Sequence, residues 1–116
     1  FVTVGSGGAF SSGSAELTSQ ARKIMEKIAD KGVGETGTVT VSGHTDNVPI
    51  YNEFFSSNWE LSAARAVSVV HSLLEFSQID KNLVMAVGSA DTEPIAPNTD
   101  SVNRAANRRV EIKLEF

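Results

Sequence analysis

The 116-residue sequence contains no cysteine, which excludes disulfide bonds, thiolate metal sites and thiol nucleophiles. It also lacks an apolar run approaching the roughly 18 residues that a membrane-spanning helix needs. The basic excess typical of nucleic-acid-binding domains is missing as well, because the formal net charge is −4. What remains is an ordinary globular composition, expected to form one domain over residues 1–116. Because the chain begins at Phe1, we expect a processed product or an excised fragment whose signal or anchor has been removed.

The spacing of apolar residues predicts strands and helices in the order strand, helix, strand, helix, strand, short helix, strand. Thr18 is the expected N-cap of the first helix, and Gly32 and Gly34 are its expected stops. Ser57 and Glu60 form an S-x-x-E capping box, which predicts the start of the second helix. The predicted strands cover residues 1–4, 38–41, 83–87 and 109–116, and the predicted helices cover residues 19–31, 57–76 and 102–107.

Alternation along the last strand indicates how the sheet is covered. Its charged side chains are expected to meet solvent on one face, while helices pack on the other face. The sequence therefore predicts an α/β (α+β) two-layer sandwich. The expected solvent face of this strand comprises Arg109, Glu111, Lys113 and Glu115, and its core face comprises Val110, Ile112, Leu114 and Phe116. The expected buried stripe of the second helix comprises Trp59, Ala63, Ala66, Val67, Val70, Leu73 and Leu74.

Candidates for enzymatic chemistry are few. His44 and Asp46 form an H-x-D pair at a strand end, but a metal site needs three or four ligands, and His71 lies in the middle of the second helix. The alternative is that His44 hydrogen-bonds its own loop. The sequence has no G-x-S-x-G nucleophile elbow and no Walker-type phosphate loop. We therefore expect no enzymatic activity, no cofactor and no metal.

A carboxylate and a guanidinium make a better binding pair. Asp46 stands at the end of a predicted strand, and Arg65 lies on the second helix in ELSAARA, whose small residues would let a ligand come close. Asn58 lies two helical turns before Arg65, on nearly the same face. An aspartate binds an ammonium group and an arginine binds a carboxylate bidentately, so the pair suits a zwitterion. Two simpler alternatives remain open: Asp46 and Arg65 pair with each other, or Asp46 caps a turn.

The basic residues concentrate at Arg104, Arg108 and Arg109. Because no aromatic residues flank them and the chain is acidic, we expect a solvated helix end or support for an anionic ligand, and no nucleic-acid partner.

Two loops carry aromatic residues. Phe10 interrupts the Gly/Ser-rich stretch 5–14, which suggests a docked loop. The aromatic group formed by Tyr51, Phe54 and Phe55 is either a contact surface or a lid that folds back on the core.

Three segments, in this order and spacing, resemble the OmpA-like peptidoglycan-binding domain. They are SGHTDNVPI at 42–50, SNWELSAARA at 57–66 and PIAPNTDSVNRAANRRVEI at 94–112. The resemblance runs from about Phe10 to the C-terminus and implies an OmpA-like βαβαβ-type fold, with helices packed on one face of a mixed four-stranded sheet. One departure is Asn103-Arg104, where many OmpA-like domains have Gly-Arg.

The family's signature implies roles for individual residues. Its TD, N-x-x-L-S-x-x-R-A and N-R-R-V motifs match this sequence at Thr45, Asn58 and Asn107 onward. The resemblance implies that Asp46 takes the ammonium group of the diaminopimelate in the peptidoglycan stem peptide, and that Arg65 takes its carboxylate. Two residues would add polar contacts, Asn58 and Thr45, and two would order the pocket wall, Asn107 and Arg108.

The strings SNWELSAARA and GAFSSGSAEL are similar to the stator B subunits of flagellar motors, MotB and PomB. This resemblance implies the periplasmic domain of an inner-membrane protein of a Gram-negative bacterium. It also implies a homodimer that anchors a stator unit to the cell wall, with a stator A subunit as partner through a separate membrane segment. The alternative is an envelope-anchoring domain of an OmpA/Pal-type outer-membrane protein or lipoprotein.

Overall fold

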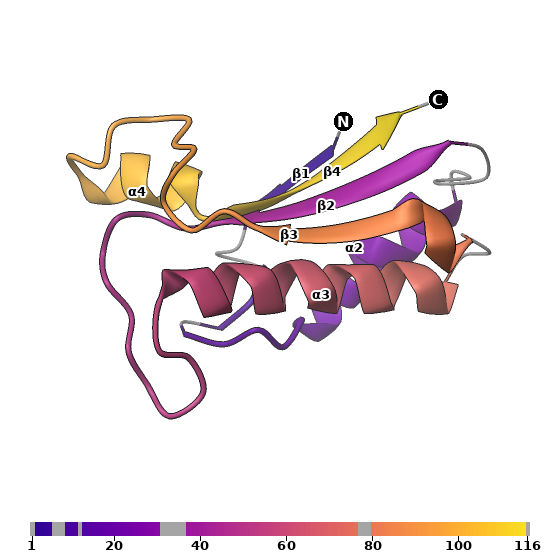
Figure 1. The fold of residues 1–116 in the computed structure, drawn as a ribbon, viewed down its shortest axis with the longest axis horizontal. Coiled ribbons are helices and arrows are strands. Elements are labelled where there is room, and N and C mark those ends of the chain that lie inside the picture. Colours follow the sequence, from indigo (N-terminus) through magenta and orange to yellow (C-terminus); the bar gives the residue numbers. More distant parts are fainter. Residues whose placement is uncertain (1, 6–8, 12, 31–36, 77–79, 116) are drawn as a thin grey trace.

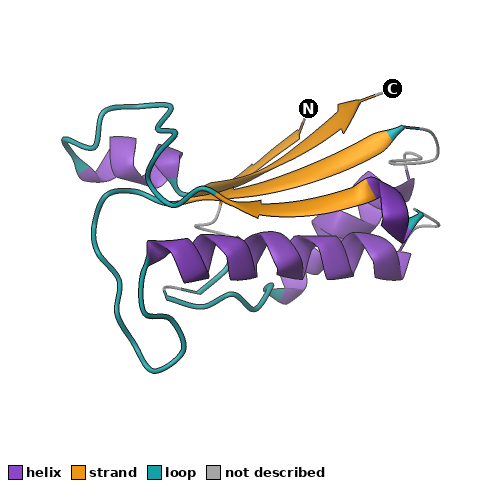
Figure 2. Ribbon diagram, in the orientation of Figure 1, coloured by secondary structure: helices purple, strands orange, loops and turns teal. Residues whose placement is uncertain are grey.

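The computed structural model describes residues 2–5, 9–11, 13–30, 37–76 and 80–115, and it confirms the predicted two-layer sandwich. A four-stranded sheet in the order β1-β4-β2-β3 has two long helices on one face (Figures 1 and 2). The sheet is mixed, because β4 is antiparallel to β1 and β2, whereas β2 is parallel to β3. Its strands are β1 (Val2–Gly5), β2 (Thr38–His44), β3 (Val84–Gly88) and β4 (Arg109–Glu115). The helices are α2 (Ser19–Asp30), α3 (Asn58–Phe76), the 3-10 turn η1 (Lys81–Leu83) and α4 (Ser101–Asn107).

Local capping signals fix where the two long helices begin. The Thr18 hydroxyl accepts a hydrogen bond from the Ala21 N–H over 3.2 Å, which confirms the predicted N-cap of α2. At α3, the Ser57 hydroxyl accepts from the Trp59 N–H over 3.1 Å and donates to the Glu60 carboxylate, and the helix begins at Asn58, directly after the predicted cap. This bond from Ser57 lowers the pKa of Glu60. The expected stops of the first helix, Gly32 and Gly34, lie outside the described residues.

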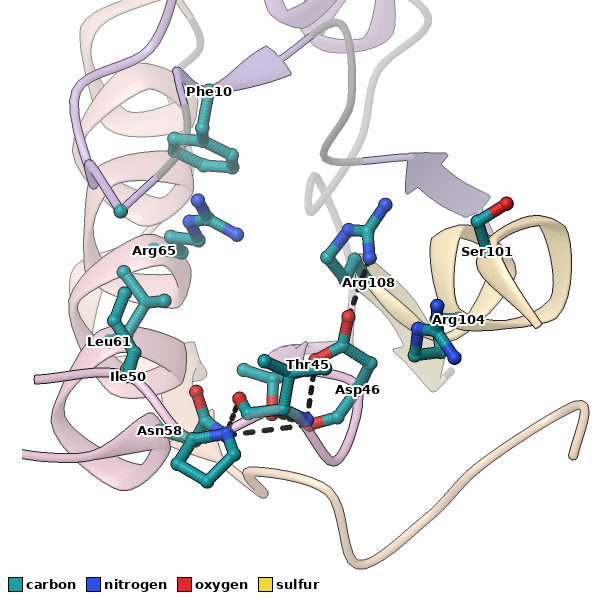
Figure 3. Close-up of a pocket in the computed structure, with 13 residues that line it drawn as sticks. Phe10, Thr45, Asp46, Ile50, Asn58, Leu61, Arg65, Ser101, Arg104 and Arg108 are labelled. Carbon is teal, nitrogen blue, oxygen red and sulfur yellow. Dashed lines mark hydrogen bonds and ion pairs between the residues drawn. The ribbon is translucent and has the colours of Figure 1, made fainter. Parts of the chain in front are cut away.

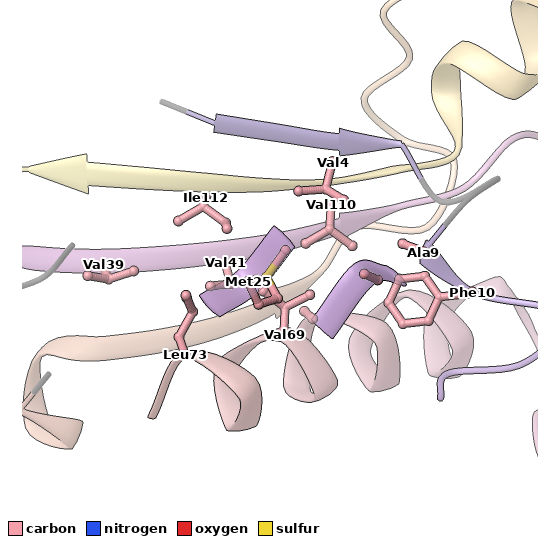
Figure 4. Packing of buried hydrophobic residues seen from close by; sticks show 12 residues of the cluster. Val4, Ala9, Phe10, Met25, Val39, Val41, Val69, Leu73, Val110 and Ile112 are labelled. Atoms are coloured by element: carbon pink, nitrogen blue, oxygen red, sulfur yellow. The ribbon is translucent and has the colours of Figure 1, made fainter. Parts of the chain in front are cut away.

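The hydrophobic core lies between the sheet and the two long helices (Figure 4). Alternation on the central strands places every second side chain in this layer, as predicted. Apolar side chains buried on this face remove surface from water, which is the main favourable term for folding. The largest fully buried apolar side chains are Met25, Leu73, Ile112, Val39, Val41, Val69 and Val110.

The predicted buried stripe of α3 is wrong at two positions. Trp59 and Val67 are 54% and 43% exposed, whereas Ser62 is completely buried. The reason is a close backbone approach: a Cβ built on Gly43 of β2 would lie 2.1 Å from the Ser62 carbonyl oxygen. Only small side chains fit a helix face at that distance. Small residues of ELSAARA therefore admit the close approach of the sheet, and their role in admitting a ligand stays a prediction.

The outer face of the sheet is covered at one end. Arg109, expected to meet solvent, is buried, and its guanidinium donates to the Glu93 and Asn107 carbonyl oxygens and to the Glu111 carboxylate. The segment after β3 crosses the sheet here and supplies Glu93, so this part of the prediction is wrong. Farther along β4, Lys113 and Glu115 are both exposed to solvent, as expected. Within the described residues, no helix combines the length and hydropathy needed to cross a membrane.

Candidate functional site

A cavity of about 570 Å³ opens at the end of the sandwich where β2 and α3 meet α4. The loop after β2, the first turns of α3, the loop around Phe10 and one face of α4 form its walls (Figure 3). Its charged lining residues are Asp46, Arg65, Arg104 and Arg108. The cavity thus brings together residues around Phe10, residues 45–65 and residues 101–108, which lie far apart in the sequence.

Asp46 holds its position through both carboxylate oxygens. Its Oδ1 accepts a hydrogen bond from the Val48 N–H over 3.0 Å, which fixes the turn after β2. Its Oδ2 accepts from Arg108 Nη1 over 2.5 Å, and the residue is only 6% exposed. Asp46 therefore lies at the cavity wall with its carboxylate largely shielded from solvent. The turn-capping alternative is confirmed, and among the described residues the cationic partner of Asp46 is Arg108 and not Arg65.

The Arg65 side chain extends from α3 along the cavity wall, and the loop that contains Phe10 holds its guanidinium. Its Nε donates to the Ser14 carbonyl oxygen over 2.9 Å and its Nη2 to the Ser11 carbonyl oxygen over 3.3 Å. Its Cζ lies 4.9 Å from the centre of the Phe10 ring, a cation–π geometry. Phe10 itself is buried, which confirms the prediction of a docked loop. Two carbonyl groups and an aromatic ring thus fix the orientation of this guanidinium.

The pKa of Arg65 is lowered to about 10, mainly by burial and then by the positive charge of Arg108. The negative charge of Asp46 raises the pKa by a smaller amount. Arg65 nevertheless stays protonated at neutral pH. The guanidinium has five N–H donors, and two of its nitrogens serve the loop carbonyls. The remaining donors can meet a ligand carboxylate.

Asn58 and Thr45 both line the cavity. Asn58 Nδ2 donates to the Val48 carbonyl oxygen over 3.0 Å and, at 3.4 Å, to that of Asp46. The Thr45 hydroxyl also donates to the Asp46 carbonyl oxygen, over 2.8 Å. Both side chains therefore hold the backbone of the loop that carries the carboxylate.

Asn107, another predicted site residue, lies outside the cavity lining and is fully buried. Its Oδ1 accepts from the N–H groups of Ile95 and Ala96, at 2.8 and 3.0 Å. Its Nδ2 donates to the Ala96 carbonyl oxygen and to Asn98 Oδ1. One amide thus fastens the segment 95–98 to the end of α4. Its role in ordering the pocket wall remains a prediction.

His44 is separate from the cavity lining. The ring is buried and neither nitrogen has a hydrogen-bond partner among the described residues, so the expected bond to its own loop is wrong. The nearest carboxylate oxygen, on Glu111, lies 3.4 Å from Nε2. Burial, reinforced by the charge of Arg109, lowers the pKa of His44, although Glu111 and Glu93 oppose the shift. Within the described part of the chain, no group of three metal-ligating side chains accompanies it.

Two parts of the site were not among the predicted site residues. Arg104 lines the cavity, and sequence reasoning noted it only within a basic cluster. The carbonyl groups of Ser11 and Ser14 were not predicted as partners of Arg65. Every residue has a backbone carbonyl, so residue type does not indicate which one accepts a hydrogen bond. The signal that pointed to this loop was Phe10, an aromatic residue in a Gly/Ser-rich stretch.

Comparison with known proteins agrees with this architecture. The OmpA family model matches residues 9–108. Motility protein B of Bacillus subtilis is 36% identical over 106 residues, covering 90% of this chain and 41% of that protein. Motility protein B of Helicobacter pylori strain J99 is 40% identical over 74 residues, covering 64% of this chain and 28% of that protein. This chain therefore spans well under half the length of these curated relatives.

Two solved structures are similar over nearly the whole chain. The cell wall anchor of the T6SS from Pseudomonas aeruginosa aligns with a TM-score of 0.88 and 39% identity, covering 97% of this chain and 78% of that one. The periplasmic domain of Helicobacter pylori MotB aligns with a TM-score of 0.83 and 30% identity, covering 96% of this chain and 78% of that one.

Proposed function

Because this chain belongs to the OmpA family, we propose that it binds peptidoglycan non-covalently and anchors a larger assembly to the cell wall. The observation that carries the proposal is the placement of the Asp46 carboxylate and the Arg65 guanidinium in one cavity. Diaminopimelate, a component of the stem peptide, presents an ammonium group and a carboxylate on one carbon. A site with one group of each sign suits that zwitterion.

In the proposed complex, the ligand ammonium binds Asp46 and its carboxylate binds the free donors of Arg65. Asp46 Oδ2 accepts from Arg108 in the free protein, so the ligand ammonium shares this oxygen or displaces Arg108 from it. Asn58 and Thr45 hold the loop of Asp46 in place while this exchange occurs. Arg108 contributes to the opposite wall, and Asn107 orders that wall from outside the lining.

Binding to isolated cell-wall sacculi tests the site. We expect Asp46→Asn and Arg65→Lys each to weaken binding by about tenfold or more, since each removes a charge-assisted contact or its bidentate geometry. Matched controls are Asp91→Asn and Arg22→Lys, both at exposed positions outside the cavity lining. If both site variants bind sacculi as tightly as the two controls while remaining folded, the assignment of the site is wrong.

We further propose that the domain has no enzymatic activity. Among the described residues that line the cavity, one is a carboxylate and none is a histidine or a cysteine. Hydrolysis of a purified muropeptide by the domain, with or without added Zn²⁺, would contradict this proposal.

For the assembly that is anchored, we favour a flagellar-motor stator of the MotB type. The similarity to motility protein B supports it. Under this proposal the domain lies in the periplasm, forms a homodimer, and works with a stator A subunit through a membrane segment outside this sequence. A second candidate is the anchor of a secretion system, which the similarity to the T6SS cell wall anchor supports. An OmpA/Pal-type envelope anchor is the third.

Phenotypes separate these assemblies. We expect a chromosomal Asp46→Asn substitution in the source bacterium to abolish swimming while flagella are still built. A secretion anchor would instead lose contact-dependent killing of neighbouring cells and keep motility. Membrane blebbing with normal motility and secretion would indicate the envelope anchor. Asp91→Asn is the control in each assay.

A further inference from the structure

The charged lining of the cavity is unbalanced. Three arginines and one aspartate face it, in a chain whose net charge is −4. A zwitterion with one ammonium group and one carboxylate brings no net charge, so it leaves this positive surplus uncompensated. We propose that the site recognises a peptide with a second carboxylate, which Arg104 binds; this inference rests on the proposed function.

Among the described residues, Arg104 is the cavity arginine whose side chain has no hydrogen-bond or ion-pair partner. It makes no ion pair or side-chain hydrogen bond with any residue that the structure describes. Arg65, in contrast, is held by two carbonyl groups, and Arg108 is paired with Asp46. The nearby Asp100 is committed to its own helix, because its carboxylate accepts from the Asn103 N–H and side-chain amide. A half-buried guanidinium without an anion is therefore available to a ligand.

The positions of the arginines indicate how such a ligand would lie. Arg65 projects from α3 on one side of the cavity, and Arg104 and Arg108 project from the α4 side, with Asp46 below them (Figure 3). A peptide whose ammonium group reaches Asp46 can place one carboxylate toward Arg65 and a second toward Arg104. The two anionic groups would then lie on opposite sides of the ammonium group.

The electrostatics inside the cavity support this arrangement. Arg108 lowers the pKa of Arg65 by repulsion, and the single Asp46 carboxylate does not offset that effect. A second anion in the cavity adds negative charge that offsets the repulsion between Arg108 and Arg65. Because arginine binds carboxylates in a planar, charge-assisted geometry, an uncharged amide at the same position is a much weaker ligand. The site therefore distinguishes a free carboxylate from its amide.

Isothermal titration calorimetry with synthetic peptides tests the inference. The parent probe is a tripeptide that ends in diaminopimelate with all carboxylates free. The carboxylate beside the side-chain ammonium group stays free in every probe. Each of two comparison probes has one of the other carboxylates converted to the amide. For the wild-type domain, we expect one of these amidations to weaken binding about tenfold. We expect Arg104→Gln to weaken binding of the parent probe by a similar factor of about ten. The affinity of this variant should not change further when the same carboxylate is amidated.

The outcomes distinguish the two proposals. If amidation leaves wild-type affinity unchanged, or weakens the wild-type domain and Arg104→Gln equally, the second carboxylate site is wrong while the proposed function stands. If the wild-type domain does not bind the parent probe, the proposed function and this inference both fail. Arg104→Lys, which keeps the charge, is expected to retain most of the sensitivity to amidation. Arg22→Gln, at an exposed position on α2, is the control for a general loss of positive charge.

Discussion

Arg108 donates a hydrogen bond from Nη1 to Oδ2 of Asp46 over 2.5 Å, linking the end of α4 to the loop after β2. The carboxylate proposed to receive a ligand ammonium thus already holds a cation in the free protein. An ammonium group entering the cavity competes with this guanidinium. The pair therefore joins two walls of the cavity at the carboxylate where the ligand ammonium is proposed to bind.

The strength of this pair can be measured by a double-mutant cycle of Asp46→Asn and Arg108→Gln. Because Asp46 is buried and the Arg108 side chain is 39% exposed, we expect a coupling of about 1 kcal/mol in the free energy of unfolding. Urea denaturation of the wild type, both single variants and the double variant gives the value. Strictly additive effects would show that the pair does not stabilise the fold.

Arg65→Lys is expected to lower the free energy of unfolding as well as wall binding. Lysine keeps the charge but has no fork to reach both the Ser14 and the Ser11 carbonyl oxygens. We expect a loss of about 1–2 kcal/mol by urea denaturation, since these part-buried carbonyl groups lose charge-assisted donors. Arg22→Lys, whose partner Glu75 is half-exposed, is expected to change stability far less. Equal losses in the two variants would argue against a structural role for the Arg65 fork.

The close contact between α3 and the sheet predicts that Gly→Ala substitutions differ sharply in their cost to the free energy of unfolding. A Cβ on Gly43 would meet the Ser62 carbonyl oxygen at 2.1 Å, and one on Gly88 would meet the Ala63 nitrogen at 2.7 Å. We expect Gly43→Ala and Gly88→Ala each to cost about 1–3 kcal/mol of unfolding free energy or more, because backbone atoms must move. Gly5→Ala is the control, since its Cβ would have no neighbour within 4 Å. Thermal unfolding that shifts equally in all three would contradict the packing.

His44 predicts a pH dependence of stability. Its folded-state pKa is lowered from 6.5, mainly by burial and then by Arg109. Below pH 6.5 the unfolded chain binds a proton at His44 that the folded chain does not, so stability falls with decreasing pH until the folded-state pKa is reached. The slope from this one group is at most about 1.4 kcal/mol per pH unit.

Urea denaturation from pH 5 to pH 7 measures this slope. We expect His44→Gln to flatten the curve in the window below pH 6.5, whatever its effect on absolute stability. The charges that face His44 in the structure are Arg109, Glu111 and Glu93. Identical slopes for wild type and variant would show that His44 is not the group responsible.

The loop after β2 carries exposed aromatic side chains that bear on the predicted homodimer. Tyr51 is 85% exposed and Phe54 is 75% exposed, so the lid alternative is wrong for both. If these side chains form a contact between copies, replacing both with serine lowers the dimer fraction in sedimentation velocity and leaves the fold intact. Val102→Ser, another exposed apolar position, is the control. An unchanged dimer fraction in the Tyr51/Phe54 variant would place the contact elsewhere.

Features that depend on neighbours in the sequence were predictable. Thr18 caps α2, and Ser57 with Glu60 starts α3, because a cap is completed within three residues. Period-two alternation likewise identified the core face of β4. The motif residues Asp46 and Arg65 were found in the sequence and lie in one cavity.

Features that depend on which segment lies opposite were not predictable. The order of strands and helices, the helix starts and the residue types of the site could be read from local spacing and side-chain chemistry alone. Tertiary structure decided that α3 turns Ser62 and not Trp59 toward the sheet, and that Arg108 is the partner of Asp46. Within the described part of the chain it also gives Arg104 no anionic partner, because residues far apart in the sequence form ion pairs that local spacing does not predict.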